Sequence, residues 1–426
     1  SDMKKLTLLV FAILFISCSD DAMETISPEI VIDDVVDEDD DLSEEDVELL
    51  TINIQIEDGF LNGFDMGNVY LSNDLGEIIE EKEIVINSTI SIEIEKLPNV
   101  KYDLTIKKES TNYIDIDTFT NISSSDYLLK SKRIFQNSED INVTMNNTGF
   151  PWEKINSGTG VLSLNAMNGG SVEWNTNLNL FQGTLYLVGL SPNEIQPRYL
   201  FAQDVLSGSN FEVDYLTLPF VENSVQIEFP SGADYTRINL KGFKTYNNLR
   251  EMKNVDDTEL SNDTYFFPNN IFDNYELNAL LIFNGESQRQ FEITNYGIPT
   301  SESFELPSFE ASLISSQLSD FELKTNSEYD FSTVTYSFFN LDISLQVSYE
   351  IHSDATNQLT FSKNVLIDNI LNSTENISSS ELKYISVVLL RNNELSGNYN
   401  EGIEAVINEN SEYPSGTRIE KIRIFE

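Results

Sequence analysis

The sequence predicts an all-β protein made of tandem β-sandwich domains that follow a disordered acidic tether. Short runs in which apolar and polar residues alternate, the period of half-buried strands, recur about every ten residues. Turn-forming residues separate these runs, and stretches with a helical period are few. Hydrophobic residues make up 40% of the chain and aromatic residues 11%, which is enough to build folded cores. Strands at this spacing favour sandwiches over alternating strand–helix units.

The chain begins with the pattern of a secretory signal peptide over residues 1–17. Lys4 and Lys5 form a basic start, and Leu6–Ile16 is an apolar run broken by one threonine. Residues 1–2 precede the methionine that we take as the initiator, so we leave them out of the fold. The apolar run covers only about half of a ~30 Å hydrocarbon core, so we do not expect a permanent transmembrane helix.

Cys18 is the only cysteine in the sequence, so a disulfide within the chain is impossible. The segment Phe15-Ile16-Ser17-Cys18 resembles the lipobox of bacterial lipoproteins, which implies a covalent lipid on Cys18. The segment departs from that pattern at Ile16, where a small residue is commoner. The alternative is an ordinary signal peptide that an incidental cysteine follows.

The three residues after the cysteine carry a possible sorting signal. Ser19, Asp20 and Asp21 resemble the acidic export signal of Bacteroidota lipoproteins. This resemblance implies an outer-membrane lipoprotein that is displayed on the cell surface. A flexible acidic segment without a sorting role is the alternative.

Residues 18–48 are expected to form the disordered tether. Residues 19–48 contain fifteen Asp or Glu and no Lys, Arg or aromatic residue, so they cannot bury enough apolar surface to offset the entropy of ordering. A flexible coil of this length spans roughly 30 Å, and repulsion between like charges extends it. The run Asp37–Asp41 could bind calcium weakly, but it lacks the spaced ligands of an EF-hand loop, so we favour a solvated spacer.

The net charge of −46 excludes some classes of partner. Because 55 of the 71 acidic residues follow position 48, the acidity extends through the folded body. Such a body repels DNA, RNA and anionic lipid surfaces. The charge is compatible with a solvated exterior surface, with basic partners or with weak divalent-cation sites.

We expect a first β-sandwich domain over residues 49–149. Its predicted strands are Leu49–Glu57, Val69–Leu71, Glu83–Asn87, Thr89–Glu95, Tyr102–Ile106 and Ile141–Met145. Residues 68–77 and 89–108 together resemble the carboxypeptidase-regulatory-like and transthyretin-like β-sandwiches, which are related in shape to immunoglobulin-like domains. That resemblance ends after Lys108, and it implies a non-catalytic spacer or docking module.

A second, β-rich domain is expected over residues 150–305. Its predicted strands are Val161–Leu164, Ser171–Trp174, Gly183–Val188, Arg198–Ala202, Phe211–Thr217, Val225–Phe229, Arg237–Leu240, Leu277–Phe283 and Arg289–Thr294. Asn-Gly pairs at 168–169 and 284–285 predict two hairpins, because both residues tolerate positive φ. Leu249–Lys253 is expected to form a helical turn, and Val255–Asn262 a loop.

A third domain, again a β-sandwich, is expected over residues 306–426 after a linker. Its predicted strands are Asp320–Leu323, Val334–Phe339, Ile343–Ile351, Gln358–Phe361, Tyr384–Leu390, Ala405–Ile407 and Arg418–Phe425. Val365–Leu371 is the one helix that we expect here.

The sequence carries no motif of a catalytic or metal site, so we predict no catalytic residue, no metal ligand and no cofactor besides the lipid. The single histidine, His352, is too little for a Ser-His-Asp triad or a two-histidine zinc site, and we interpret it as an ordinary surface or core residue rather than a lone base. A glycosidase needs two carboxylates about 5–10 Å apart, but the sequence singles out no such pair. We therefore do not expect an enzyme.

These observations favour a non-catalytic cell-surface lipoprotein. We expect a scaffold or accessory subunit docked on a large outer-membrane complex for transport, secretion or barrel assembly, with a β-barrel protein as its partner. The alternative is a glycan-binding lipoprotein of a polysaccharide-uptake system, in which Trp152 and Trp174 stack on sugar rings. We favour instead the interpretation that Trp174 lies in the core of a hairpin and that Trp152 packs at a domain junction.

Overall fold

A computed structural model confirms the all-β class, because strands make up most of the residues that it describes. The described residues are 48–130, 140–148, 155–157, 163–168, 171–177, 182–191, 194–246, 249–257, 264–284, 288–305, 310–326, 329–354, 356–371, 377–394, 399–407 and 414–425. Residues 48–426 form one compact unit. The signal peptide and nearly all of the tether lie outside the described residues.

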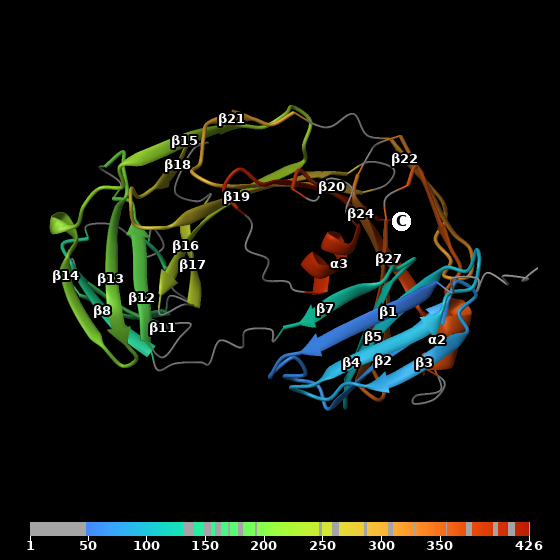
Figure 1. Cartoon of the computed structure of the whole chain (residues 1–426). Helices are drawn as coiled ribbons and strands as arrows, with labels where there is room; N and C mark the ends of the chain where they lie inside the picture. Colours follow the sequence, from blue (N-terminus) through green and yellow to red (C-terminus); the bar gives the residue numbers. More distant parts are fainter. Residues whose placement is uncertain are drawn as a thin grey trace, which may run out of the picture. The chain divides into compact units, whose positions relative to one another are not determined.

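The largest element is a twelve-stranded sheet (Figure 1). In spatial order its strands are β17 (Leu249–Asp257), β16 (Tyr235–Tyr246), β19 (Asn274–Phe283), β20 (Arg289–Tyr296), β28 (Arg418–Phe425), β27 (Lys383–Asn392), β24 (Phe331–Asn340), β25 (Leu345–Asp354), β6 (Tyr113–Phe119), β5 (Tyr102–Ser110), β2 (Met66–Asn73) and β3 (Ile78–Glu83). Neighbouring strands in this sheet run antiparallel except at β25 and β6, which run parallel.

Five smaller sheets accompany the central one. Their strands are β1 (Leu49–Ile56), β4 (Thr89–Glu95) and β7 (Ser125–Leu129); β8 (Asp140–Asn146), β10 (Ser163–Asn168), β11 (Ser171–Asn177) and β14 (Asn210–Asp214); β9 (Ile155–Ser157), β12 (Gln182–Gly189) and β13 (Arg198–Leu206); β15 (Asn223–Glu228), β18 (Thr264–Phe267) and β21 (Glu302–Ser303); and β22 (Ala311–Ser315), β23 (Phe321–Thr325) and β26 (Gln358–Phe361). The described helical segments are α2 (Asn364–Leu371), α3 (Tyr399–Ile407), η2 (Tyr215–Thr217) and η4 (Ser379–Glu381).

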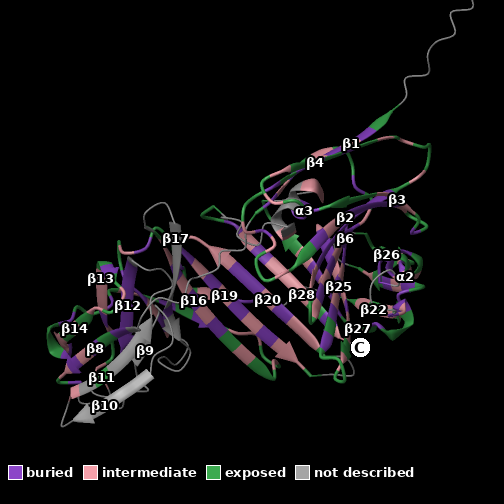
Figure 2. Ribbon diagram, turned by 90° about the horizontal axis from the view of Figure 1, so that it is seen from below, coloured by how far each residue is buried: buried purple, intermediate pink, exposed green. Residues whose placement is uncertain are grey.

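The alternation seen in the sequence becomes alternating burial in the strands. In β19, every second residue from Tyr275 to Leu281 is buried, and Figure 2 shows this banding on the central sheet. Leu50, Ile52 and Ile54 of β1 are buried in the same way, and they pack with Leu71 of β2 in one apolar core. Strands with one buried face satisfy their backbone groups in the sheet and place their apolar side chains in a core.

The three expected domains share the central sheet. It takes strands from 49–149, from 150–305 and from 306–426, so these ranges do not form separate sheets. The apolar cores cross the ranges as well: Ile114 and Ile116 of β6 pack in one cluster with Val347 and Tyr349 of β25. Long-range strand pairing gives no signal in the local sequence, and this is why the shared sheet was not expected.

Strand β8 corrects the expected end of the first domain. The sequence analysis assigned Ile141–Met145 to the range 49–149, but β8 pairs with β11 and β14 of the following range. Ile141 and Val143 are buried in a core with Leu185 and Leu187. The apolar alternation predicted the strand correctly but contained no information on its partners.

Three local predictions were wrong. Glu83–Asn87, expected as a strand, lies almost entirely after β3, which ends at Glu83. Leu249–Lys253, expected as a helical turn, lies in β17 and pairs with β16 from Leu249↔Tyr246 onward, because tertiary pairing overrides weak helix propensity. Ala405–Ile407, expected as a strand, ends the helix α3. Three apolar residues are too short a window to distinguish the helical period from the period of a strand.

Helix α3 packs beside β7 and covers part of the central sheet (Figure 1). Tyr399, Ile403 and Val406, spaced at about one turn, face the core that contains Ile52 and Leu104. A Cβ on Gly402 would lie 2.9 Å from the ring of Phe331, so glycine allows the helix to approach β24 closely.

A buried ion pair joins β5 to the residues just before α2. The side chains of Asp103 and Lys363 are 2% and 5% exposed, and Lys363 Nζ donates to Asp103 Oδ2 at 2.5 Å. The other carboxylate oxygen accepts the backbone N–H of Asn121. Burial raises the pKa of Asp103, and the charge of Lys363 opposes that rise. Each charge therefore depends on the other for compensation.

We predict that Asp103→Asn or Lys363→Met alone lowers the free energy of unfolding by about 3–5 kcal/mol, because one buried charge then lacks its partner. The double variant Asp103→Leu/Lys363→Met should recover most of that loss, since neither charge remains. Urea unfolding of all four proteins at pH 7 measures this. A double variant less stable than either single variant would contradict the prediction.

Candidate functional site

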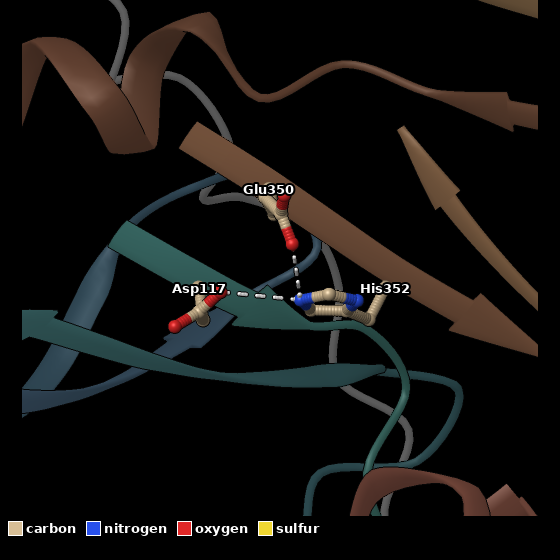
Figure 3. Close-up of side chains that lie close together, drawn as sticks. All are labelled: Asp117, Glu350 and His352. Atoms are coloured by element: carbon tan, nitrogen blue, oxygen red, sulfur yellow. Dashed lines mark hydrogen bonds and ion pairs between the residues drawn. The ribbon is translucent and has the colours of Figure 1, made fainter. Parts of the chain in front are cut away.

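The parallel pairing of β6 with β25 brings together the polar side chains of the candidate site. The register places Asp117 beside Glu350, and Phe119 beside His352. These side chains lie on the face opposite to Ile116 and Ile351, because successive residues of a strand point to opposite faces. Figure 3 shows Asp117, Glu350 and His352 pointing toward one another.

The imidazole of His352 is fixed in place by its surroundings. His352 is only 1% exposed, so it is a core residue. A core position was one of the two ordinary roles, surface or core, that we expected for it from the sequence. The ring stacks on Phe119 at 4.8 Å between centroids, and Phe331 lies at 5.8 Å. Its Nδ1 is hydrogen-bonded to Thr333 Oγ1 at 3.0 Å. The ring therefore presents Nε2 in one direction only.

Two carboxylates face that nitrogen. Asp117 Oδ1 lies 3.3 Å from Nε2, and Glu350 Oε2 lies 3.8 Å from it. One ligand atom from each of the three residues lies within 4.8 Å of the others. Such a group can hold a cation, or it can exchange a proton between the carboxylates and the imidazole.

The side chain of Glu350 has a raised pKa. Burial is the largest cause, and it raises the pKa of Glu350 above its ordinary value. The positive character of His352 opposes this rise, the negative charges of Asp117 and Asp115 add to it, and Arg423 opposes it weakly. Burial and the neighbouring carboxylates therefore disfavour the ionised form of Glu350, and a raised pKa of this kind is common among functional carboxylates.

A cavity of about 250 Å³ opens onto these carboxylates. Its lining combines acidic, basic and aromatic side chains, among them Asp115, Asp117, Glu350, Lys108, Lys130 and Tyr113. Lys108 Nζ lies 2.6 Å from Asp115 and 5.2 Å from the ring centre of Phe64. The cavity is large enough for a few waters or a small polar ligand.

The residues proposed from the sequence lie elsewhere. Cys18, Ser19, Asp20, Asp21 and Trp152 are outside the described residues, so the lipidation, export and glycan interpretations of these positions stay predictions. Trp174 lies in β11, where its backbone pairs with Leu164 and Val143.

Asp117 and Glu350 were not among the site residues predicted from the sequence. A signal was present, since Asp115 and Asp117 alternate with buried isoleucines, and Glu350 and His352 share one face of their strand. However, β6 and β25 are separated by more than two hundred residues, and no local pattern predicts their pairing.

No family model matches this chain, and a search of curated proteins found no match. Among the described residues, no helix has the length and apolar character that crossing a membrane requires.

We predict that Glu350→Gln stabilises the metal-free protein at pH 7. The gain should not exceed about 1 kcal/mol, because solvent screens a side chain that is 37% exposed. A carboxyl whose pKa is raised by folding supports the fold below the unfolded-state pKa and loses that contribution as the pH rises through the folded-state value. The gain should therefore disappear near pH 4. Urea unfolding at both pH values tests this, and a loss of stability at pH 7 would contradict it.

Proposed function

We propose that this chain is a non-catalytic cell-surface lipoprotein of the Bacteroidota type that acts as a scaffold or accessory subunit docked on a large outer-membrane complex. The lipobox-like segment ending at Cys18 and the acidic residues 19–21 support the membrane address. A lipid on Cys18 and a tether of roughly 30 Å would keep the folded body close to proteins of the outer membrane.

The observation that carries the docking proposal is the exposed apolar tip of the β24–β25 hairpin. Phe339, Leu341 and Ile343 are 59%, 79% and 58% exposed and lie within five residues of one another. Asn340 fixes the turn by accepting the backbone N–H of Asp342 through its side chain. Clustered exposed apolar side chains on a water-soluble surface are typical of interaction sites.

The charge of the body favours a protein as the occupant of this tip. An acidic body is repelled by anionic lipid headgroups, so insertion of the tip into such a surface would work against electrostatics. An outer-membrane β-barrel protein offers apolar and aromatic side chains near the membrane interface without that repulsion. The proposed complex for transport, secretion or barrel assembly would contain such a barrel.

Glycan binding remains the alternative. It depends on Trp152, which lies outside the described residues, and on Trp174, of which only the backbone pairing in β11 is described. Glycan binding therefore stays an alternative, and we propose no sugar-binding site in the described part of the chain.

The proposal predicts that full-length protein, affinity-purified from detergent-solubilised outer membranes, brings a β-barrel protein with it in stoichiometric amount. Leu341→Ser/Ile343→Ser should reduce this recovery at least tenfold, because both apolar contacts are removed. Cys18→Ala should move the chain out of the membrane fraction, since the lipid is then absent. Mass spectrometry of the purified material measures all three results.

Ile298→Ser is the matched control. Ile298 is 77% exposed just after β20, so its substitution removes one strongly exposed apolar side chain that does not belong to the tip. Recovery with this variant should equal that of the unsubstituted chain. Purification as a free monomer, or equal recovery with the tip variant, would argue against docking, and membrane retention of Cys18→Ala would argue against the lipid anchor.

A further inference from the structure

At the β6–β25 ladder, His352 Nε2 faces two carboxylate oxygens at distances close to those between ligands of one metal ion. When each bond to a tetrahedral zinc ion is about 2.1 Å, neighbouring ligand atoms stand about 3.4 Å apart. The gap between His352 Nε2 and Asp117 Oδ1 is 3.3 Å, and the gap to Glu350 Oε2 is 3.8 Å. A small rotation of the partly exposed Glu350 side chain would bring its oxygen to ligand distance.

The surroundings of His352 match those of a metal-bound histidine. Metal-ligating histidines usually donate the N–H of their other ring nitrogen to a fixed acceptor, which orients the lone pair toward the metal. Thr333 Oγ1, 3.0 Å from Nδ1, is placed to be that acceptor. The stacked ring of Phe119 prevents the imidazole from turning away. In this tautomer Nε2 has no proton and points at two carboxylates.

With Nε2 unprotonated, its lone pair and the two carboxylates repel one another, and a divalent cation bound by all three would remove that repulsion. With a proton on Nε2, the same nitrogen instead donates a hydrogen bond to Asp117 Oδ1 at 3.3 Å. Lys108, a cation that lines the same cavity, is already 2.6 Å from Asp115. Asp117 and Glu350 also line the cavity, so an ion held between them would keep a coordination position open to water or a ligand.

We propose that Asp117, Glu350 and His352 bind one divalent transition-metal ion, with Zn²⁺ as the best match. An imidazole ligand and two carboxylates suit zinc, whereas Ca²⁺ prefers six to eight oxygen ligands. The site is independent of the proposed docking tip, which lies at the turn of the β24–β25 hairpin. It also differs from the weak calcium binding that the acidic tether could show.

The test is calorimetric titration of the full-length, metal-stripped protein with Zn²⁺. We expect one tight site in the body, which Asp117→Asn and Glu350→Gln each weaken at least tenfold; even an outer-shell partner of a metal ligand is worth about 10–100-fold in affinity. Glu93→Gln is the control. It removes an exposed carboxylate of β4 that does not line this cavity, and its affinity should stay within about threefold of the unsubstituted chain.

A spectroscopic readout keeps the test independent of variant folding. Co²⁺ in place of Zn²⁺ should give the visible absorption of a four-coordinate site in the unsubstituted chain, and His352→Gln should abolish it. Thermal unfolding without metal shows that each variant is folded. If a proton on Nε2 occupies the gap instead, neither tight Zn²⁺ binding nor a coloured Co²⁺ complex will appear, and the proposal is overturned. Binding that is equal in all variants places the ion on the tether and overturns it as well.

Discussion

The parallel ladder between β6 and β25 is the interaction on which the rest of the structure depends. Its seven residue pairs join a strand from the first third of the chain to one from the last third. Without it the twelve-stranded sheet would separate into two antiparallel parts. Ile114 and Ile116 would also lose their place in the core with Val347 and Tyr349. A parallel pair requires a long connection, and here that connection includes the whole middle region of the chain.

The same ladder has a polar face, and that face carries the residues of the candidate site. One side of β6 and β25 is buried in an apolar core, while the other side holds Asp117, Glu350 and His352 beside a cavity. The apolar core fixes the register, because a slip of one residue would exchange the two faces. Packing on one side of the sheet thus sets the distances between functional groups on the other.

Local patterns predicted much of the fold. Alternation located β1, β4 and β19, an Asn-Gly pair predicted the β19–β20 hairpin, and α2 was recognised as a helix. The failures have a common cause. β17 is a strand because β16 pairs with it, and α3 is a helix because three of its side chains reach a core. The candidate site was not predicted for the same reason, because two strands that are distant in the sequence pair to form it.

The acidity of the chain bears on both proposals. The acidity of the segment after Cys18 and of the body is compatible with the solvated exterior position that we propose, and the proposed docking tip adds an apolar surface to this acidic chain. The proposed metal site would add a cation between Asp117, Glu350 and His352. Docking and metal binding use different residues, so either proposal can be correct without the other.

The most direct test of the central claim, that the β6–β25 ladder builds a metal site, is X-ray anomalous scattering at the zinc edge from crystals of the Zn²⁺-loaded protein. The anomalous map should show one strong peak about 2.0–2.2 Å from His352 Nε2 and from a carboxylate oxygen of Asp117 and of Glu350. A map with no peak between these three side chains, or a structure in which β6 and β25 are not paired, would contradict the claim.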